Sequence, residues 1–428
     1  MRGRVLSHSC LMFFTIALIL SGATGPCRTL RAELLTRSEA VRIALAANPS
    51  LEISRQQWQI MKALAVQRLT LPEPELEVEY EELPSGIIPG AYGQRNVGVN
   101  QRLELPHKWY LQKKSAGERA TAVEWSVFRA KNNEITAAVK LAYDRLLLRK
   151  MILEHEKGNL ELAEEIFRKA SLRFQAGDVA QLEVLRAEVE LARAEATMTD
   201  SENELDVTTA ELNTLLARDI HEPVEMTEEL EYQYIEIDPE TLKDSALMYR
   251  PELKGARAGL VAARNDKILA STSFLTDVNI GIFRQRIRAG AFSNDYWRAK
   301  ISFELPFWAP FSLRGRIMEK SSELRRDEAA LEEAERAVFL EIERSVHALN
   351  SAFKQVELYR DRIVHEAEQA YGFAAKSYEE GKASYLELLE ARKTLTDSRI
   401  EYSQKLYDYR AAMTRLELAS GYPLFENN

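Results

Sequence analysis

The chain has 428 residues, two cysteines and a formal net charge of −9 at pH 7. Long stretches dominated by Ala, Glu, Leu, Arg and Lys are typical of long helices rather than of compact mixed folds. The acidic balance argues against nucleic acid as a partner. Cys10 lies at the start of the N-terminal apolar run, which leaves at most one cysteine in the mature chain, so no thiol-based metal or disulfide framework is expected.

Residues 1–32 have the pattern of a secretory signal peptide. Two arginines precede an apolar run, and small residues follow it. Because the run is shorter than a membrane-spanning helix, we expect it to be cleaved rather than retained. Cys27 offers the alternative of a lipid-modified N-terminus, which Pro26 directly before it disfavours.

Residues 33–218 are predicted to form one structural repeat. A helical segment, Ser38–Leu71, is followed by alternating residues that predict a pair of strands within 74–105. Next comes a proline-free stretch whose apolar residues recur in steps of three and four, as in a coiled-coil seam. It ends at Gly177, which can close a helix in the left-handed conformation. A returning helix is expected over about Ala180–Ala217.

Residues 240–423 are predicted to repeat this order, after a linker at 219–239 and before a tail at 424–428. The second strand pair is expected within 275–305 and the second helical tip near Gly381. Even the tip sequences correspond: "RFQAGDVAQLEVLRAE" in the first half and "SYEEGKASYLELLEAR" in the second. Since a returning helix is too short to cover the long one, each half is predicted to pack one long helix against two shorter coaxial helices.

The predicted strands each have an apolar and a polar side. Leu76, Val78 and Tyr80 alternate with glutamates. In Trp297–Leu305 apolar residues likewise alternate with polar ones. Alternation alone fits a sheet with one wetted face. Export, strand lengths suited to a tilted bilayer crossing and the lack of a separate apolar layer favour a lipid-facing side. Four strands do not close a barrel, so we expect oligomerisation; three copies give twelve strands and a wider lumen than two.

These features resemble the TolC-like outer membrane efflux factors over about Leu35–Pro423. The passages that carry the resemblance are "LTRSEAVRIALAANPSLE", "LELPHKWYLQKKSAGER", "FELPFWAPFSLRGRIMEKSSEL" and the two glycine turns. The sequence patterns "ELP…K" and "PFW…GRI" most resemble those of the branch that serves heavy-metal efflux pumps. The resemblance implies a fold that is mainly α with transmembrane β: two tandem repeats assembled into a trimeric α-barrel with a 12-stranded β-barrel.

The resemblance also implies a location and partners. It places a homotrimer in the outer membrane of a Gram-negative bacterium, in contact with lipid and with a large periplasmic portion. A periplasmic adaptor (membrane fusion) protein and an inner-membrane pump of the resistance-nodulation-division class would dock with it. The duct would be passive, without a cofactor, and would export metal cations or small toxic compounds.

An acidic aperture is the first candidate site that the resemblance implies. Family members have two acidic residues six and nine positions after the second tip glycine, and these positions are Glu387 and Glu390 here. Three copies would bring such carboxylates into one narrow ring that attracts cations. In the first repeat Glu183 keeps the first acidic position, whereas Arg186 replaces the second. The alternative is that these glutamates lie on a solvated helix face.

The two helical tips are the second candidate site. The resemblance implies that they form the closed periplasmic entrance and contact the adaptor through Gly177, Asp178, Gly381 and Lys382.

Catalysis is not expected, because the six histidines are scattered and no HExxH motif, phosphate loop or nucleophile elbow is present. We therefore predict neither a metal site nor catalytic residues. Two alternatives to an efflux duct remain: the outer membrane duct of a type I protein secretion system, and a periplasmic coiled-coil adaptor or scaffold without a pore. An adaptor would need compact β-rich domains around a single hairpin, whereas two hairpins are predicted.

Overall fold

The structure is a computed structural model that describes residues 34–68, 70–83, 92–234, 237–289, 292–305, 307 and 309–422. The predicted signal peptide at 1–32, Cys27 within it and the tail at 424–428 lie outside the described residues.

The first repeat contains a short strand, two short helices, a strand pair and a long helical hairpin, in the predicted order. Its elements are β1 (Leu34–Leu35), α1 (Arg37–Ala47), α2 (Pro49–Gln67), β2 (Glu75–Glu81), β3 (Gln94–Leu103), α3 (Pro106–Val123), the π-helical η1 (Glu124–Arg129), α4 (Ala130–Ala176) and α5 (Gln181–Leu216).

The second repeat has the same order after a linker that contains a two-residue strand. Its elements are β4 (Glu225–Met226), α6 (Pro239–Tyr249), α7 (Pro251–Ser271), β5 (Val278–Ala289), β6 (Phe292–Phe303), α8 (Ala309–Leu358), the π-helical η2 (Tyr359–Ile363), α9 (Val364–Glu379) and α10 (Tyr385–Ser420).

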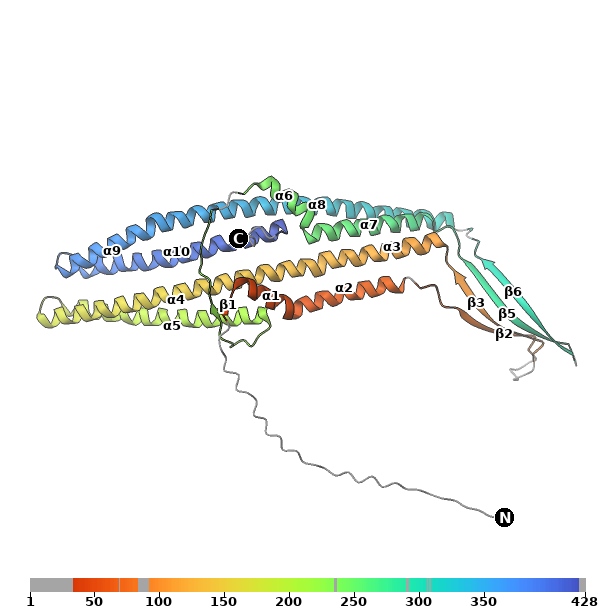
Figure 1. The fold of residues 1–428 in the computed structure, drawn as a ribbon, viewed down its shortest axis with the longest axis horizontal. Coiled ribbons are helices and arrows are strands. Elements are labelled where there is room, and N and C mark those ends of the chain that lie inside the picture. Colours follow the sequence, from red (N-terminus) through yellow and green to blue (C-terminus); the bar gives the residue numbers. More distant parts are fainter. Residues whose placement is uncertain are drawn as a thin grey trace, which may run out of the picture.

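The helices form an elongated, curved layer with the sheet at one end and the two hairpin tips at the other (Figure 1). The continuous helix α3–η1–α4 packs against α2 near the sheet and against α5 near the tips, and α8–η2–α9 packs in the same way against α7 and α10. The two repeats meet through α3 with α7 and through α4 with α10. This is the predicted arrangement of one long helix against two coaxial shorter ones in each half.

The coaxial joints are held by corresponding residues. Asn48, the N-cap of α2, accepts from the backbone N–H of Ser50 and donates its side-chain amide to the carbonyl of Leu215 at 2.9 Å. Arg250, at the N-terminus of α7, donates to the carbonyls of Leu418 and Ala419 at 3.1 and 3.0 Å. In each joint a side chain from the start of one helix satisfies carbonyls that the end of the other helix leaves without partners.

Each long helix contains one π-helical stretch, η1 or η2, which the sequence analysis did not predict. A π turn inserts an extra residue and so shifts the phase of the side-chain pattern. The residues in both stretches are ordinary helix formers, which explains why sequence pattern alone predicted uninterrupted α-helices.

The largest core lies midway along the helices, where the N-terminal segment and the linker cross them. β1 pairs in parallel with β4, and the hydroxyl of Tyr143 donates to the carbonyl of Leu35 at 2.8 Å. Beside it the fully buried Asp144 of α4 pairs with Arg37 at 2.8 Å and with Arg410 of α10 at 3.5 Å. These contacts fasten both repeats and the crossing segments together.

The four long strands form one antiparallel sheet in the order β2-β3-β5-β6. The two predicted strand pairs therefore join through β3 and β5, and the outer edges of β2 and β6 have no further strand partner within the described residues. β5 and β6 are longer than the alternating segments from which they were predicted, since β5 continues to Ala289 and β6 begins at Phe292.

One face of the sheet is apolar and uncovered. The side chains of Leu76, Trp297 and Ile301 are 73%, 78% and 70% exposed. On the other face Phe283 is fully buried over Gly98 and Gly281, where a Cβ at either glycine would collide with its ring. The polar face is thus closely packed by its own side chains, whereas the apolar face has no cover from the part of the chain that the structure describes.

Candidate functional site

The two hairpin tips are built in the same way. α4 ends at Gly177 with φ +84°, and the turn after α9 contains Gly381 with φ +70°; both lie in the left-handed region that favours glycine. The backbone amide of Asp178 donates to the carbonyl of Arg173 at 2.9 Å. In the second tip the backbone amide of Lys382 donates to the carbonyl of Ser377 at 2.8 Å. These are the bonds that close a helix end and let the chain turn back at once.

The tips of the two hairpins pack against each other through a small core of their own. Alanines on α4 and α5 let the helices approach closely, while two tyrosines on α9 and α10 fill the space between them. The buried members of this core, here named the tip core, are Ile166, Ala170, Ala187, Tyr378, Tyr385 and Leu388. Burial raises the pKa of Tyr385 to about 12 and also raises that of Tyr378, so both phenols stay neutral.

Polar contacts between the hairpins surround the tip core. The Tyr378 hydroxyl donates to Glu183 at 3.4 Å, and the Arg173 guanidinium lies over the Tyr378 ring at 4.8 Å from its centre. Arg392 of α10 pairs with Glu190 of α5 at 3.6 Å. Within one chain, therefore, side chains from both repeats hold the tips together.

The predicted aperture residues do not share one environment. Glu183 is half-buried and faces Tyr378, whereas Glu387 and Glu390 are exposed on α10. The Glu387 carboxylate accepts from the backbone amide and the hydroxyl of Ser384, and these bonds lower the pKa of Glu387. Glu387 thus belongs to a capping box that starts α10.

The predicted adaptor-contact residues lie at the outermost end of the molecule. Gly177 and Asp178 are exposed in one tip, and Gly381 and Lys382 are exposed in the other. The Lys382 ammonium pairs with Glu380 at 2.6 Å within its own turn. A protein that approached the tips along the long axis of the molecule would contact all four residues.

Sequence reasoning missed the tip core and several polar contacts of this site. Ser384 and Glu387 carry the S-x-x-E signature of a capping box, which was readable in the sequence but was not used. Arg392 and Glu190 had no local signal, because they lie about 200 positions apart and meet only through the packing of the hairpins. Arg392 is unusual in that its Nε and Nη1 are buried without a hydrogen-bond partner in the described structure.

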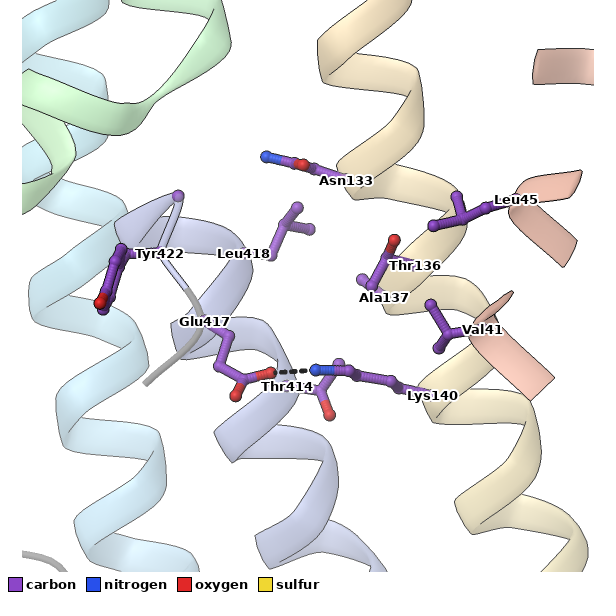
Figure 2. Close-up of a pocket in the computed structure, with 11 residues that line it drawn as sticks. Val41, Leu45, Asn133, Thr136, Ala137, Lys140, Thr414, Glu417, Leu418 and Tyr422 are labelled. Atoms are coloured by element: carbon purple, nitrogen blue, oxygen red, sulfur yellow. Dashed lines mark hydrogen bonds and ion pairs between the residues drawn. The ribbon is translucent and has the colours of Figure 1, made fainter. Parts of the chain in front are cut away.

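A separate cavity of about 270 Å³ lies between α1, α4 and α10, away from both tips (Figure 2). Its polar feature is a buried ion pair between Lys140 and Glu417 at 2.9 Å, which joins the two repeats. The remaining wall is mostly apolar, and none of the predicted site residues lines the cavity. Within the described residues, no group of three or more His, Cys, Asp or Glu side chains has a geometry that could hold a metal ion.

Comparisons with known proteins agree with this geometry. Residues 242–422 match the sequence model of the family described as outer membrane efflux protein. CusC, solved in a study of transmembrane channel formation, is 16% identical with a TM-score of 0.77 over 92% of this chain and 94% of that one. VceC of Vibrio cholerae is 18% identical with a TM-score of 0.76 over 90% and 96%, and CmeC of Campylobacter jejuni is 17% identical with a TM-score of 0.76 over 91% and 87%. Among curated protein sequences none matches.

The second repeat therefore matches the outer membrane efflux protein family, and the whole chain has the fold of the solved channels. The resemblance drawn from the glycine turns and strand-to-helix passages is thereby confirmed. Outer membrane efflux proteins are transport components rather than enzymes; VceC is an outer membrane protein and CmeC an outer membrane channel. In the described part of this chain, no helix is long and apolar enough to span a membrane.

Proposed function

We propose that three copies of this chain form a passive duct through the outer membrane of a Gram-negative bacterium, as one component of a tripartite efflux system. The observation that carries the proposal is the sheet. Among the described residues it presents an uncovered apolar face and two outer strands without further strand partners, at the end of the molecule opposite the tips.

The unpartnered strand edges require neighbours in a lipid environment, because unpaired backbone groups are costly where there is no water. If β6 of one copy pairs with β2 of the next, every edge is satisfied. Three copies then contribute twelve strands, which close into a 12-stranded β-barrel with an open lumen, whereas eight strands would be filled by side chains. The helical layers of the three copies would continue this wall as a periplasmic α-barrel.

The tips are the proposed periplasmic entrance. Glu390, which is exposed on α10, would line a ring of three carboxylates, with Glu387 beside it and Glu183 nearer the tip core. The exposed turns at Gly177–Asp178 and Gly381–Lys382 would contact a periplasmic adaptor, which in turn binds a resistance-nodulation-division pump. Metal cations or small toxic compounds are the proposed cargo, on the strength of the strand-to-helix passages that resemble the heavy-metal branch.

Conductance across planar lipid bilayers tests the duct. The purified wild-type protein is expected to show small, mostly closed channels, because the tip contacts hold the entrance shut. A double variant, Glu183→Gln with Tyr378→Phe, removes one tie between the hairpins and should raise the open fraction. Lys382→Gln is the matched control, since Lys382 bonds only within its own turn. If neither wild type nor the double variant ever conducts, the chain is not a duct.

A further inference from the structure

The apolar face of the sheet changes character along its length. Because directly paired residues share a face, the strand register defines rows across it. Near the helices the rows are apolar, such as Leu103–Val278–Phe303 and Leu76–Val99–Ile282–Ala299. Farther out comes the mixed row Val78–Val97–Arg284–Trp297, and then the polar row Tyr80–Arg95–Arg286–Asp295. The same side of the sheet is therefore apolar first and basic toward its far end.

Four arginines make up this basic patch, here named the rim patch: Arg95, Arg284, Arg286 and Arg288. Asp295 accepts hydrogen bonds from Arg284 at 2.8 Å and from Arg286 at 2.7 Å. A second carboxylate, Glu82, lies at the end of β2 beside Gly93. The rim patch and its two carboxylates thus contain four positive and two negative charges, so each copy has a surplus of positive charge at this place.

An aromatic residue organises the rim patch. The ring of Tyr92 is buried, with the guanidinium of Arg288 at 4.3 Å from its centre and that of Arg95 at 5.7 Å. Tyr80 packs edge-on against the same ring. Stacking of this kind holds arginine side chains in place while leaving their N–H groups able to donate. The arginine of β5 nearest the apolar rows, Arg284, keeps 64% of its side chain exposed.

The position of the rim patch matches a membrane boundary. The apolar side of this chain segment extends from Leu305, two residues past the end of β6, to Trp297, which is roughly 26 Å at about 3.3 Å per residue. A strand tilt near 40° reduces this to about 20 Å along a barrel axis, close to the apolar band of about 25 Å found in outer membrane barrels. The arginines then lie at the far edge of the lipid layer, level with headgroups rather than acyl chains.

We infer that the rim patch binds the phosphate groups of a phosphorylated glycolipid in the outer leaflet. Arginine presents a planar fork of donors that matches phosphate oxygens in charge and geometry. The adjoining exposed side chains of Trp297 and Ile282 suit the acyl chains of the same lipid. The inference rests on the proposed function, because it requires the apolar face to meet the membrane.

The test compares two double variants that each lose two positive charges from opposite faces of the sheet. Arg284→Gln with Arg288→Gln weakens the rim patch but leaves the Arg286–Asp295 pair. Arg298→Gln with Lys300→Gln is the control on the polar face. Binding of bisphosphorylated lipid A to each purified channel is measured by native mass spectrometry, together with lipid A stripped of phosphate and with inorganic phosphate as a competitor.

The rim variant should bind bisphosphorylated lipid A at least about fivefold more weakly than wild type, since charge-assisted contacts are lost. The control should stay within about twofold, and phosphate-free lipid A should bind wild type as weakly as it binds the rim variant. Equal binding by wild type and rim variant would overturn the inference, as would complete displacement of the lipid by inorganic phosphate. Bilayer conductance of the same samples separates this outcome from failure of the duct itself.

Discussion

At the scale of single residues, the tips are held by a few long-range contacts rather than by one motif. Arg392 is the costliest of them, because its side chain is only 6% exposed and its ion pair with Glu190 spans 3.6 Å. A buried arginine with donors left without partners destabilises the packing around it. The packed tips therefore combine a stabilising apolar core with an unfavourable charge.

This balance predicts opposite effects from two substitutions. Glu190→Gln should lower the free energy of unfolding by about 2 kcal/mol, because it leaves Arg392 buried without its counter-charge. Adding Arg392→Met should recover most of that loss, since an apolar side chain of similar length fills the same space. Thermal and denaturant unfolding of the detergent-solubilised protein measures both. A double variant less stable than Glu190→Gln would contradict this account of Arg392.

The pKa of Glu387 gives a pH-dependent prediction. Hydrogen bonds from Ser384 hold this pKa below the ordinary glutamate value of 4.5, so the ionised form is favoured in the folded state. Its stabilising contribution is complete above pH 4.5 and is lost as the pH falls through the lowered pKa. Wild type should melt at a higher temperature than Glu387→Gln at pH 7, and the difference should shrink steadily as the pH falls below 4.5. The neighbouring variant Glu390→Gln, which removes no cap, should show no such trend.

At the scale of helices and strands, the account depends on the coaxial joints. Proline-free windows and two glycines were enough to predict the helices, because prolines are excluded from helix interiors and glycine suits the left-handed turn. The pairing of Asn48 with Leu215 and of Arg250 with Leu418 was not predictable. This pairing depends on which helix ends meet in space, and residue spacing in the sequence does not predict that.

Substitution at a joint should cost more than substitution on the helix surface. Asn48→Ala removes both the cap of α2 and the bond to Leu215, and it should destabilise the protein by about 1–2 kcal/mol. Gln57→Ala, on the exposed side of the same helix, should change stability by less than about 0.5 kcal/mol. Equal unfolding free energies for the two variants would show that the joint contributes nothing.

At the scale of the whole molecule, the proposed trimer rests on the sheet. Alternation in four short segments predicted the strands and their two faces, and the uncovered apolar face agrees with that prediction. The union of the two strand pairs through β3 and β5 was not predicted, because sequence alternation fixes faces but not which strands become neighbours. Nor could the sequence supply the contacts of Tyr378 with Glu183 between the tips, since the two residues belong to different repeats.

The number of chains in the detergent-solubilised particle tests the central claim most directly. Native mass spectrometry of the purified protein should find three copies, held together because β2 and β6 of neighbouring copies pair and the apolar face is covered only by lipid or detergent. A single chain that stays dissolved and folded after the detergent is removed would contradict the account.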